Sequence, residues 1–280
     1  MTVKPREITA AHSPDSDDAF MFYALAHEKL DTGGLKIRRI AKDIQTLNQE
    51  ALKCTYDVTA ISFAVYPQIC SNYVLTTCGA SMGENYGPVL IAKREVQSEE
   101  LAALRVAIPG KLTTAYLCLM LCQPGINVVE IPFDEIIEAV DSGSVDAGLL
   151  IHEGQLTYIG RGLRKILDLG EWWHKRTGLP LPLGGNAIRK GLGDQLIKRT
   201  TKLLKESIVY SLAHRDEALN YAMSFAKGMK ADLLNRYVGM YVNELTIDCG
   251  QRGRQAIERL FAEAFRQGLL KQPVVPEFAD

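Results

Sequence analysis

The sequence lacks the long hydrophobic runs that membrane proteins and exported proteins carry. Its 280 residues are 47% hydrophobic, but no apolar run approaches the roughly 20 residues that a membrane-spanning helix requires. The segment 1–7 carries charged residues and leads into a short strand-like run, without the apolar region of a secretory signal. We therefore expect a cytoplasmic protein with no membrane partner.

An excess of charge of either sign is also missing. The chain has 32 basic and 33 acidic side chains, which leaves a formal net charge of -1. Proteins that bind nucleic acids or anionic lipid surfaces usually present an excess of positive charge. The balanced composition predicts no nucleic-acid partner and favours a small-molecule ligand.

Metal-binding and nucleotide-binding motifs are absent too. The six cysteines include no Cys-x-x-Cys pair, and no histidine has a second histidine or a cysteine at metal-ligand spacing. The glycine-rich signatures of mononucleotide and dinucleotide loops do not occur, and neither does the Gly-x-Ser-x-Gly elbow of serine hydrolases. We expect no bound metal, and a nucleotide-dependent transferase or dehydrogenase is disfavoured.

The sequence does contain an α/β pattern that is followed by a helical region. Up to about residue 190, short apolar or β-branched runs alternate with amphipathic stretches, which is typical of βαβ units around mainly parallel sheets. Residues 194–268 place apolar side chains at helical spacing with almost no strand pattern. The chain is long enough for one large domain or two medium-sized domains.

A weak internal repeat favours two lobes. Two segments, 47–62 and 136–152, each read as a helix, a turn, an aspartate and a strand that ends in a polar residue. These terminal residues are Ser62 and His152. We interpret the repeat as two similar lobes with a ligand cleft between their strand ends. The expected lobes are a large one of residues 1–93 and 187–280 and a small one of residues 95–185.

His152 is the leading catalytic candidate. It follows a short apolar run, and side chains beyond the carboxyl end of a strand in an open α/β sheet line the crevice where ligands bind. An imidazole has an unperturbed pKa of about 6.5, so it can accept a proton near neutral pH. The alternative is a capping or packing histidine in a loop.

A second candidate site begins at Gly110. A strand-like run leads into this glycine turn, after which Thr113 and Thr114 open an apolar helix. Backbone N–H groups at a helix start, together with two hydroxyl groups, can bind a carboxylate or a phosphate. Alternatively, a threonine here serves only as the N-cap of the helix.

Three aspartates, Asp15, Asp17 and Asp18, follow the first predicted strand. They resemble a metal or phosphate loop, but the stronger interpretation is a helix that begins near Ser16. Ser13 or Asp15 would cap that helix, and the other acids would complement its dipole. Because the helix follows the first strand, we expect Ser13 to offer a hydrogen-bond donor at the rim of the cleft.

Several runs carry a resemblance to a known family. They are Ser13-Pro14 with Asp18 and Phe20, Thr46-Leu47-Asn48, Gly110 with Thr113-Thr114-Ala115-Tyr116, Ala147-Gly148 with Ile151-His152-Glu153, Thr157-Tyr158, Thr177-Gly-Leu-Pro-Leu-Pro-Leu-Gly184, Tyr241-Val242-Asn243 and Leu260-Phe-Ala-Glu-Ala264. In these runs, which span nearly the whole chain, the sequence resembles the 1,4-dihydroxy-6-naphthoate synthase family of the futalosine route to menaquinone.

The resemblance implies a fold, a reaction and a set of site residues. The fold is an α/β, two-lobed, type II periplasmic-binding-protein-like fold with a helical C-terminal segment. The reaction releases 1,4-dihydroxy-6-naphthoate from cyclic dehypoxanthinyl futalosine, a carboxylated bicycle, without a redox cofactor. By analogy, His152 is the general base that removes a hydroxyl proton and starts carbon-carbon cleavage. The family's cleft contacts correspond to Asn48, Ser62, Thr113, Thr114 and Ala115.

The chain departs from the family in one motif, and several alternatives stay open. This chain reads Ser-Pro-Asp-Ser-Asp-Asp-Ala-Phe at 13–20, where many members carry Cys-Pro-Asn-Asp-Thr after the Ser-Pro. The added negative charge is unfavourable for a carboxylate, which leaves open a changed substrate of the same lyase class. Taken alone, Asn48 is equally well an ordinary surface amide. Rival functions are a binding protein or sensor for an aromatic carboxylate and the sister chorismate dehydratase, and a homodimer is also open.

Overall fold

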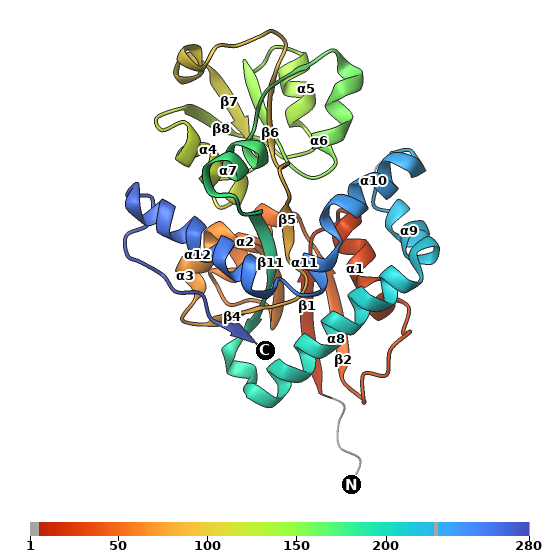
Figure 1. Ribbon diagram of the computed structural model, residues 1–280. Helices are drawn as coiled ribbons and strands as arrows, with labels where there is room; N and C mark the ends of the chain where they lie inside the picture. The colour runs from red at the N-terminus through yellow and green to blue at the C-terminus, as the bar shows by residue number, and fades with distance from the viewer. Residues whose placement is uncertain (1–5, 227–228, 280) are drawn as a thin grey trace. The chain divides into compact units, whose positions relative to one another are not determined.

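The computed structural model describes residues 6–226 and 229–279, which form two compact α/β units. The first unit contains the chain up to Ser81, Gly184–Gln251 and the segment from Val275 onward. The second unit contains Met82–Leu183 and Arg252–Val274. Each unit has its own sheet, so each is treated below as a separate body (Figure 1).

The first sheet has a parallel half and an antiparallel strand. Its order among the described residues is β12-β4-β11-β3-β1-β2, and β5 also pairs with β11. β1 runs parallel to β2 and β3, whereas β11 runs antiparallel to β3 and β4. The strands are β1 (Glu7–His12), β2 (Lys36–Ala41), β3 (Val58–Ser62), β4 (Tyr73–Thr76), β5 (Ser81–Gly83), β11 (Leu181–Arg189) and β12 (Phe278–Ala279).

Helices cover both faces of the first sheet. One face packs against α1 and α8 through a core that includes Phe20, Leu203 and Ile208. The other face packs against α2 through Ala11, Leu47 and related side chains. The helices of this unit are α1 (Ser16–Ala26), α2 (Ile44–Ala51), α3 (Tyr66–Ile69), α8 (Asp194–Ala213), α9 (Arg215–Met223), α10 (Ala231–Tyr241) and α11 (Glu244–Ile247).

The second sheet has the order β10-β6-β9-β7-β8. β7 runs parallel to β8 and β9, whereas β6 runs antiparallel to β9 and β10. Its strands are β6 (Val89–Ala92), β7 (Arg105–Ile108), β8 (Asn127–Glu130), β9 (Ala147–Leu150) and β10 (Arg164–Asp168). Both sheets are therefore mixed rather than mainly parallel, because β6 and β11, near the expected crossings of the chain, run against their neighbours.

The helices of the second unit pack on this sheet and on one another. α5 lies against β9, and its Ile136 and Val140 join Val89, Ile91 and Ala107 in one core cluster. α4 packs beside α7 (Figure 1). The helices are α4 (Thr114–Cys122), α5 (Ile136–Asp141), α6 (Gly154–Thr157), α7 (Leu169–Thr177) and α12 (Gly250–Arg266), which begins at the end of the first unit.

The division into units differs from the expected lobes at two segments, besides a shift of two residues at Gly184 and Gly185. Residues 82–93 fall in the second unit because β6 pairs with β9 and β10. Most of α12 also falls in the second unit, where Glu263 receives a hydrogen bond of 3.2 Å from Arg176. Helical periodicity alone could not show on which unit this last helix packs.

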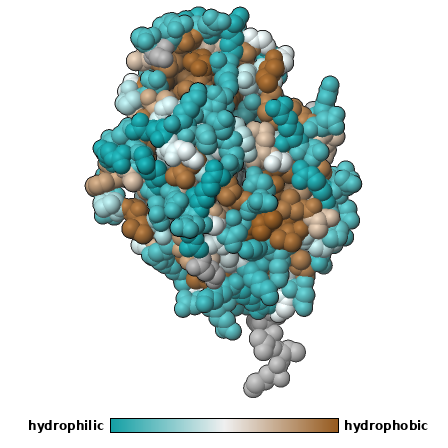
Figure 2. Space-filling model, in the orientation of Figure 1, coloured by the Kyte–Doolittle hydropathy of each residue, from teal (hydrophilic) through white to brown (hydrophobic). Residues whose placement is uncertain are grey.

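The C-terminal region is helical, as predicted. The described part of residues 194–268 is built from α8 to α12. In residues 6–226 and 229–279, no helix combines the length and hydrophobicity that crossing a bilayer requires. The face drawn in Figure 2 is largely hydrophilic, and hydrophobic residues interrupt it in separate patches.

Candidate active site

His152 lies two residues beyond the end of β9, in the turn that leads into α6. Its backbone φ is 51°, in the left-handed region that few residues other than glycine adopt. The backbone N–H of Gln155 donates to the His152 carbonyl at 3.2 Å, which fixes the turn. The imidazole is half-buried and meets the ring of Phe133 nearly edge to face, with ring centroids 5.0 Å apart. His152 therefore occupies the predicted strand end.

Thr113 is the N-cap residue of α4. Its hydroxyl accepts from the backbone N–H of Tyr116 at 3.2 Å and donates to the carbonyl of Gly110 at 2.7 Å. Thr114 and Ala115 follow as the first helical residues, and both are buried. The capping interpretation of Thr113 is thus confirmed, and the start of α4 still presents the helix dipole at this end of β7.

The two predicted features of the second unit share one sheet edge. β7 and β9 are parallel neighbours, with Val106 opposite Ala147 and Ala107 opposite Gly148. The carboxyl ends of parallel neighbours meet at the same edge, which is where open α/β sheets place their ligand sites. His152 and the start of α4 therefore lie at one edge of this sheet.

In the first unit, Asn48 and Ser62 form a buried pair. The backbone N–H of Ser62 donates to Oδ1 of Asn48 at 2.8 Å, and Nδ2 of Asn48 donates to the Ser62 hydroxyl oxygen at 3.0 Å. A backbone N–H can only donate, so this contact fixes the orientation of the amide. Asn48 is fully buried, which shows that the alternative of an ordinary surface amide is wrong.

The hydrogen bond from Asn48 determines what Ser62 can offer to a ligand. Because the Ser62 oxygen already accepts from the amide, its own proton points elsewhere. Among the described residues the structure shows no acceptor for this proton. A carboxylate or carbonyl oxygen of a ligand could accept this proton, since a serine hydroxyl both donates and accepts hydrogen bonds.

Ser13 lies at the same edge of the first sheet. It follows β1, which runs parallel to β3, so Ser13 and Ser62 follow or end neighbouring strands. The backbone N–H of Ser13 donates to Oδ2 of Asp18 at 2.7 Å. The Ser13 hydroxyl is buried and has no hydrogen-bond partner within the described residues. A buried hydroxyl without a hydrogen-bond partner costs free energy, and a bound ligand that hydrogen-bonds to it would remove that cost.

The acidic residues after Ser13 hold the start of α1 in place. Asp15 caps the helix by accepting from the backbone N–H of Asp18 at 3.2 Å. Asp17 is buried and accepts a hydrogen bond of 3.2 Å from the hydroxyl of Tyr237. The capping interpretation of this segment is confirmed, with Asp15 rather than Ser13 as the cap.

Sequence reasoning missed two aromatic neighbours of these strand ends. His12, the last residue of β1, is buried and stacks on Phe22 with ring centroids 4.5 Å apart. Burial lowers the pKa of His12, although its Nδ1 lies 2.8 Å from the carbonyl oxygen of Ser13. Phe133, beside His152, is the second. His12 could have been found by the strand-end argument that found His152, whereas nothing local marks Phe133.

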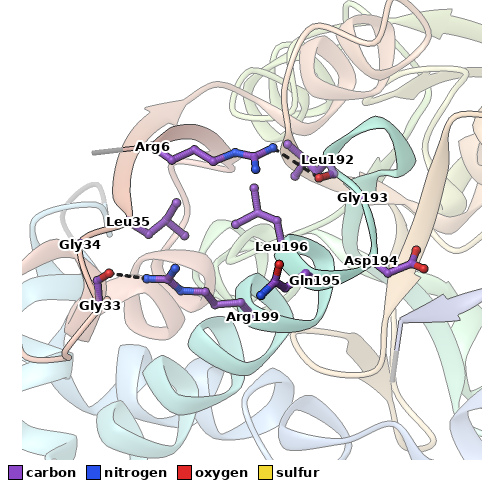
Figure 3. A pocket seen from close by; sticks show the side chains of 10 residues that line it. All are labelled: Arg6, Gly33, Gly34, Leu35, Leu192, Gly193, Asp194, Gln195, Leu196 and Arg199. Carbon is purple, nitrogen blue, oxygen red and sulfur yellow. Dashed lines mark hydrogen bonds between the residues drawn. The ribbon is translucent and has the colours of Figure 1, made fainter. Parts of the chain in front are cut away.

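A pocket of about 600 Å³ in the first unit lies apart from all of these residues (Figure 3). It is lined by the 33–35 turn, the start of α8 and two arginines. Arg6 donates to the carbonyl of Leu192 at 3.4 Å and Arg199 to that of Gly33 at 2.7 Å. Arg199 therefore ties the 33–35 turn to α8, and Arg6 ties the start of β1 to the turn before α8. None of the predicted site residues lines this pocket.

Comparison with known proteins gives a consistent set of relatives. A family model described as menaquinone biosynthesis matches residues 8–266. A 1,4-dihydroxy-6-naphthoate synthase from Thermus thermophilus is 40% identical over 95% of this chain and 97% of its own length. The enzyme of the same name from Streptomyces coelicolor is 36% identical over 93% of each chain.

Solved structures agree with the observed fold. A protein from Archaeoglobus fulgidus is 44% identical and superposes with a TM-score of 0.91, covering 94% of this chain and 98% of that one. The alkanesulfonate-binding protein from Xanthomonas axonopodis is only 11% identical but has a TM-score of 0.72 over 98% and 97% of the two chains. At that identity the likeness concerns the fold alone, which is the periplasmic-binding-protein fold.

Proposed function

The chain is an enzyme of the menaquinone biosynthesis family, and we propose that it converts cyclic dehypoxanthinyl futalosine to 1,4-dihydroxy-6-naphthoate. Two relatives that cover more than nine-tenths of its length carry the name of this synthase. Their names support the synthase over the sister dehydratase, which was a rival from the sequence alone.

The observation that carries the proposed mechanism is the position of His152. Its side chain is half-buried at the carboxyl edge of the second sheet, on a backbone held in the left-handed region. Non-glycine residues in that region are uncommon, and they occur preferentially at functional sites. In the proposed reaction, the imidazole removes a hydroxyl proton from the sugar-derived part of the substrate. The resulting alkoxide drives carbon-carbon cleavage, after which the released bicycle aromatises.

Each unit by itself offers groups that suit a substrate carboxylate. The Ser62 hydroxyl proton is directed away from Asn48, and the dipole of α4 favours a negative charge at Thr114 and Ala115. The Ser13 hydroxyl supplies a further donor in the first unit.

The partners of the chain are part of the same proposal. We propose that it works in the cytoplasm on a small carboxylated molecule, with neither nucleic acid nor membrane as a partner. A homodimer stays an open alternative, which sedimentation of the purified protein would decide.

The test is a turnover assay with a matched set of histidine variants. Wild type, His152→Ala and His27→Ala, an exposed histidine on the surface of the first unit, are each mixed with cyclic dehypoxanthinyl futalosine. Release of the naphthoate is followed by absorbance and mass. We expect wild-type and His27→Ala rates to agree and His152→Ala to lose about 100-fold or more in kcat, the usual effect of removing a general base.

Added imidazole sharpens the test of the base. If His152 acts as a proton acceptor, free imidazole should restore part of the His152→Ala rate in proportion to the concentration of its neutral form. Binding without product in wild type would overturn the synthase assignment and favour a binding protein or sensor. Full activity of His152→Ala would leave the reaction standing but remove His152 from it.

A further inference from the structure

Phe133 contacts His152, although the strands that precede these two residues are not neighbours in the sheet. Phe133 lies in the loop after β8, and His152 lies in the turn after β9. The strand order is β9-β7-β8, with both pairings parallel, so the two loops leave the same edge of the sheet with the end of β7 between them. Across that end, the two rings meet with centroids 5.0 Å apart and an interplanar angle of 72°.

The main chain around His152 is fixed, and the contact with Phe133 acts on the orientation of the imidazole. The left-handed φ of 51° and the hydrogen bond from Gln155 determine where the side chain leaves the backbone. They do not determine rotation about the two side-chain torsions. The edge-to-face arrangement with Phe133 is the geometry that aromatic pairs prefer, because the positive edge of one ring meets the negative face of the other.

We propose that Phe133 is a positioning residue for His152, which keeps the imidazole in the rotamer from which it removes the substrate proton. The inference rests on the proposed function insofar as it takes His152 to be the base. A general base must lie within about 2.6–3.2 Å of the proton donor. An imidazole in another rotamer would lie outside this range, and small misplacements of a catalytic group can cost up to about 100-fold in rate.

The kinetic arm compares three substitutions of Phe133. We expect Phe133→Ala to lower kcat about 10-fold with KM changed less than about 2-fold, because the loss acts on the base and not on carboxylate binding. Phe133→Tyr keeps the ring and should retain most of kcat, whereas Phe133→Leu keeps the bulk without the ring and should resemble Phe133→Ala. Phe265→Ala, which truncates an exposed phenylalanine of α12 in the same unit, is the matched control.

A double-mutant cycle separates positioning from a general structural effect. If Phe133 acts through His152, adding Phe133→Ala to His152→Ala should change the residual rate by less than about 2-fold. An additive loss in the double variant would overturn the proposal, and so would an unchanged kcat in an active enzyme that carries Phe133→Ala alone.

A spectroscopic arm keeps the test independent of the reaction. The Cε1–H signal of His152 in histidine-labelled protein is identified by its loss in His152→Ala. We expect Phe133→Ala to shift and broaden this signal, and Phe133→Tyr to leave it sharp. If wild type does not turn over the substrate, the proposed function fails while this arm still decides the positioning. An unmoved, sharp signal in Phe133→Ala would overturn the inference.

Discussion

Hydrogen-bond partners decide what single residues of the candidate site can do. Asn48 and Ser62 hold each other through two buried hydrogen bonds, which direct the Ser62 hydroxyl proton away from the Asn48 amide. Ser13, by contrast, keeps a buried hydroxyl that no described residue engages. Residue type therefore identifies the candidates, and the hydrogen-bond geometry assigns their roles.

Asn48→Ala should destabilise the protein by about 1–3 kcal/mol, because it leaves the buried N–H of Ser62 without an acceptor. The free energy of unfolding in urea is the measurement. Asn220→Ala, at an exposed position of α9, is the control and should change stability by less than about 0.5 kcal/mol. Equal stabilities for wild type and Asn48→Ala would show that the pair contributes nothing.

His12 should make stability depend on pH. Burial lowers its pKa in the folded state below the unfolded value of about 6.5. Above that pH both states are neutral and His12 contributes no pH dependence. As pH falls below about 6.5, the unfolded state takes up a proton that the folded state resists, so stability is lost. His12→Asn should lose less stability than wild type between about pH 7.5 and pH 5.5 in urea titrations. Parallel losses in the two proteins would contradict this.

The strand ends of the site were predictable at the residue scale because each one follows a local apolar run. Ser62 ends the run 58–61, and His152 follows 147–151. Phe133 carries no such mark, since its contact with His152 depends on the sheet order and not on local sequence. Aromatic residues in loops are common, and only the fold shows which of them reaches a catalytic candidate.

At the scale of elements, close packing of α5 on β9 supports the turn that carries His152. A Cβ atom at Gly148 would lie 2.5 Å from Cγ2 of Ile136 and 2.8 Å from Cγ2 of Val140. Neither distance is compatible with van der Waals radii, so the helix can approach the strand this closely only over a glycine. The close packing of α5 thus explains why a glycine occupies the middle of this buried strand.

Gly148→Ala should therefore destabilise the protein by about 1–3 kcal/mol through overpacking. Because α5 or β9 must shift to admit the methyl group, kcat should fall as well. Thermal or urea unfolding measures the first effect and the turnover assay the second. Gly160→Ala is the control, since its Cβ would have no atom within 4 Å. Two glycine variants of equal stability would contradict the packing argument.

Element types were easier to predict than element pairings. The helical region from residue 194 follows from apolar spacing of period 3.6, and the structure confirms it. The antiparallel runs of β6 and β11 were not predicted. An apolar run of four to nine residues looks alike in either direction, so the sequence of a buried strand does not reveal the orientation of its neighbours.

At the scale of the whole chain, α12 packs in the second unit, although the first unit separates it in sequence from the rest of that unit. Glu263 on α12 is buried and accepts hydrogen bonds from Arg176 at 3.2 Å and from Arg259 at 2.8 Å, and Arg266 lies 2.8 Å away. Burial alone would raise the pKa of this carboxyl, but the three arginines outweigh it and lower the pKa to about 2. This cluster ties α12 to α7, although the two helices lie far apart in the sequence.

Glu263→Gln should cost about 1–3 kcal/mol in the free energy of unfolding near neutral pH, with the lower end favoured because the arginines are half exposed. The folded-state pKa lies below the unfolded value of about 4.3, so the contribution is complete above that pH. It is lost as pH falls toward about 2. Urea titrations at about pH 7 and pH 3 should show the two proteins converging in acid. A difference that persists unchanged at low pH would contradict the ionic origin of the contribution.

The sequence by itself determined the α/β class, the helical C-terminal region, the resemblance to the family and the positions of Ser62 and His152 at strand ends. Each of these follows from local periodicity or from motifs within short segments. Only the tertiary structure decided that Asn48 holds Ser62, that Phe133 meets His152, that β6 and most of α12 belong to the second unit, and that Glu263 gathers three arginines. The physical reason is that these contacts join segments whose spacing along the chain carries no periodic signal, so that packing alone brings them together.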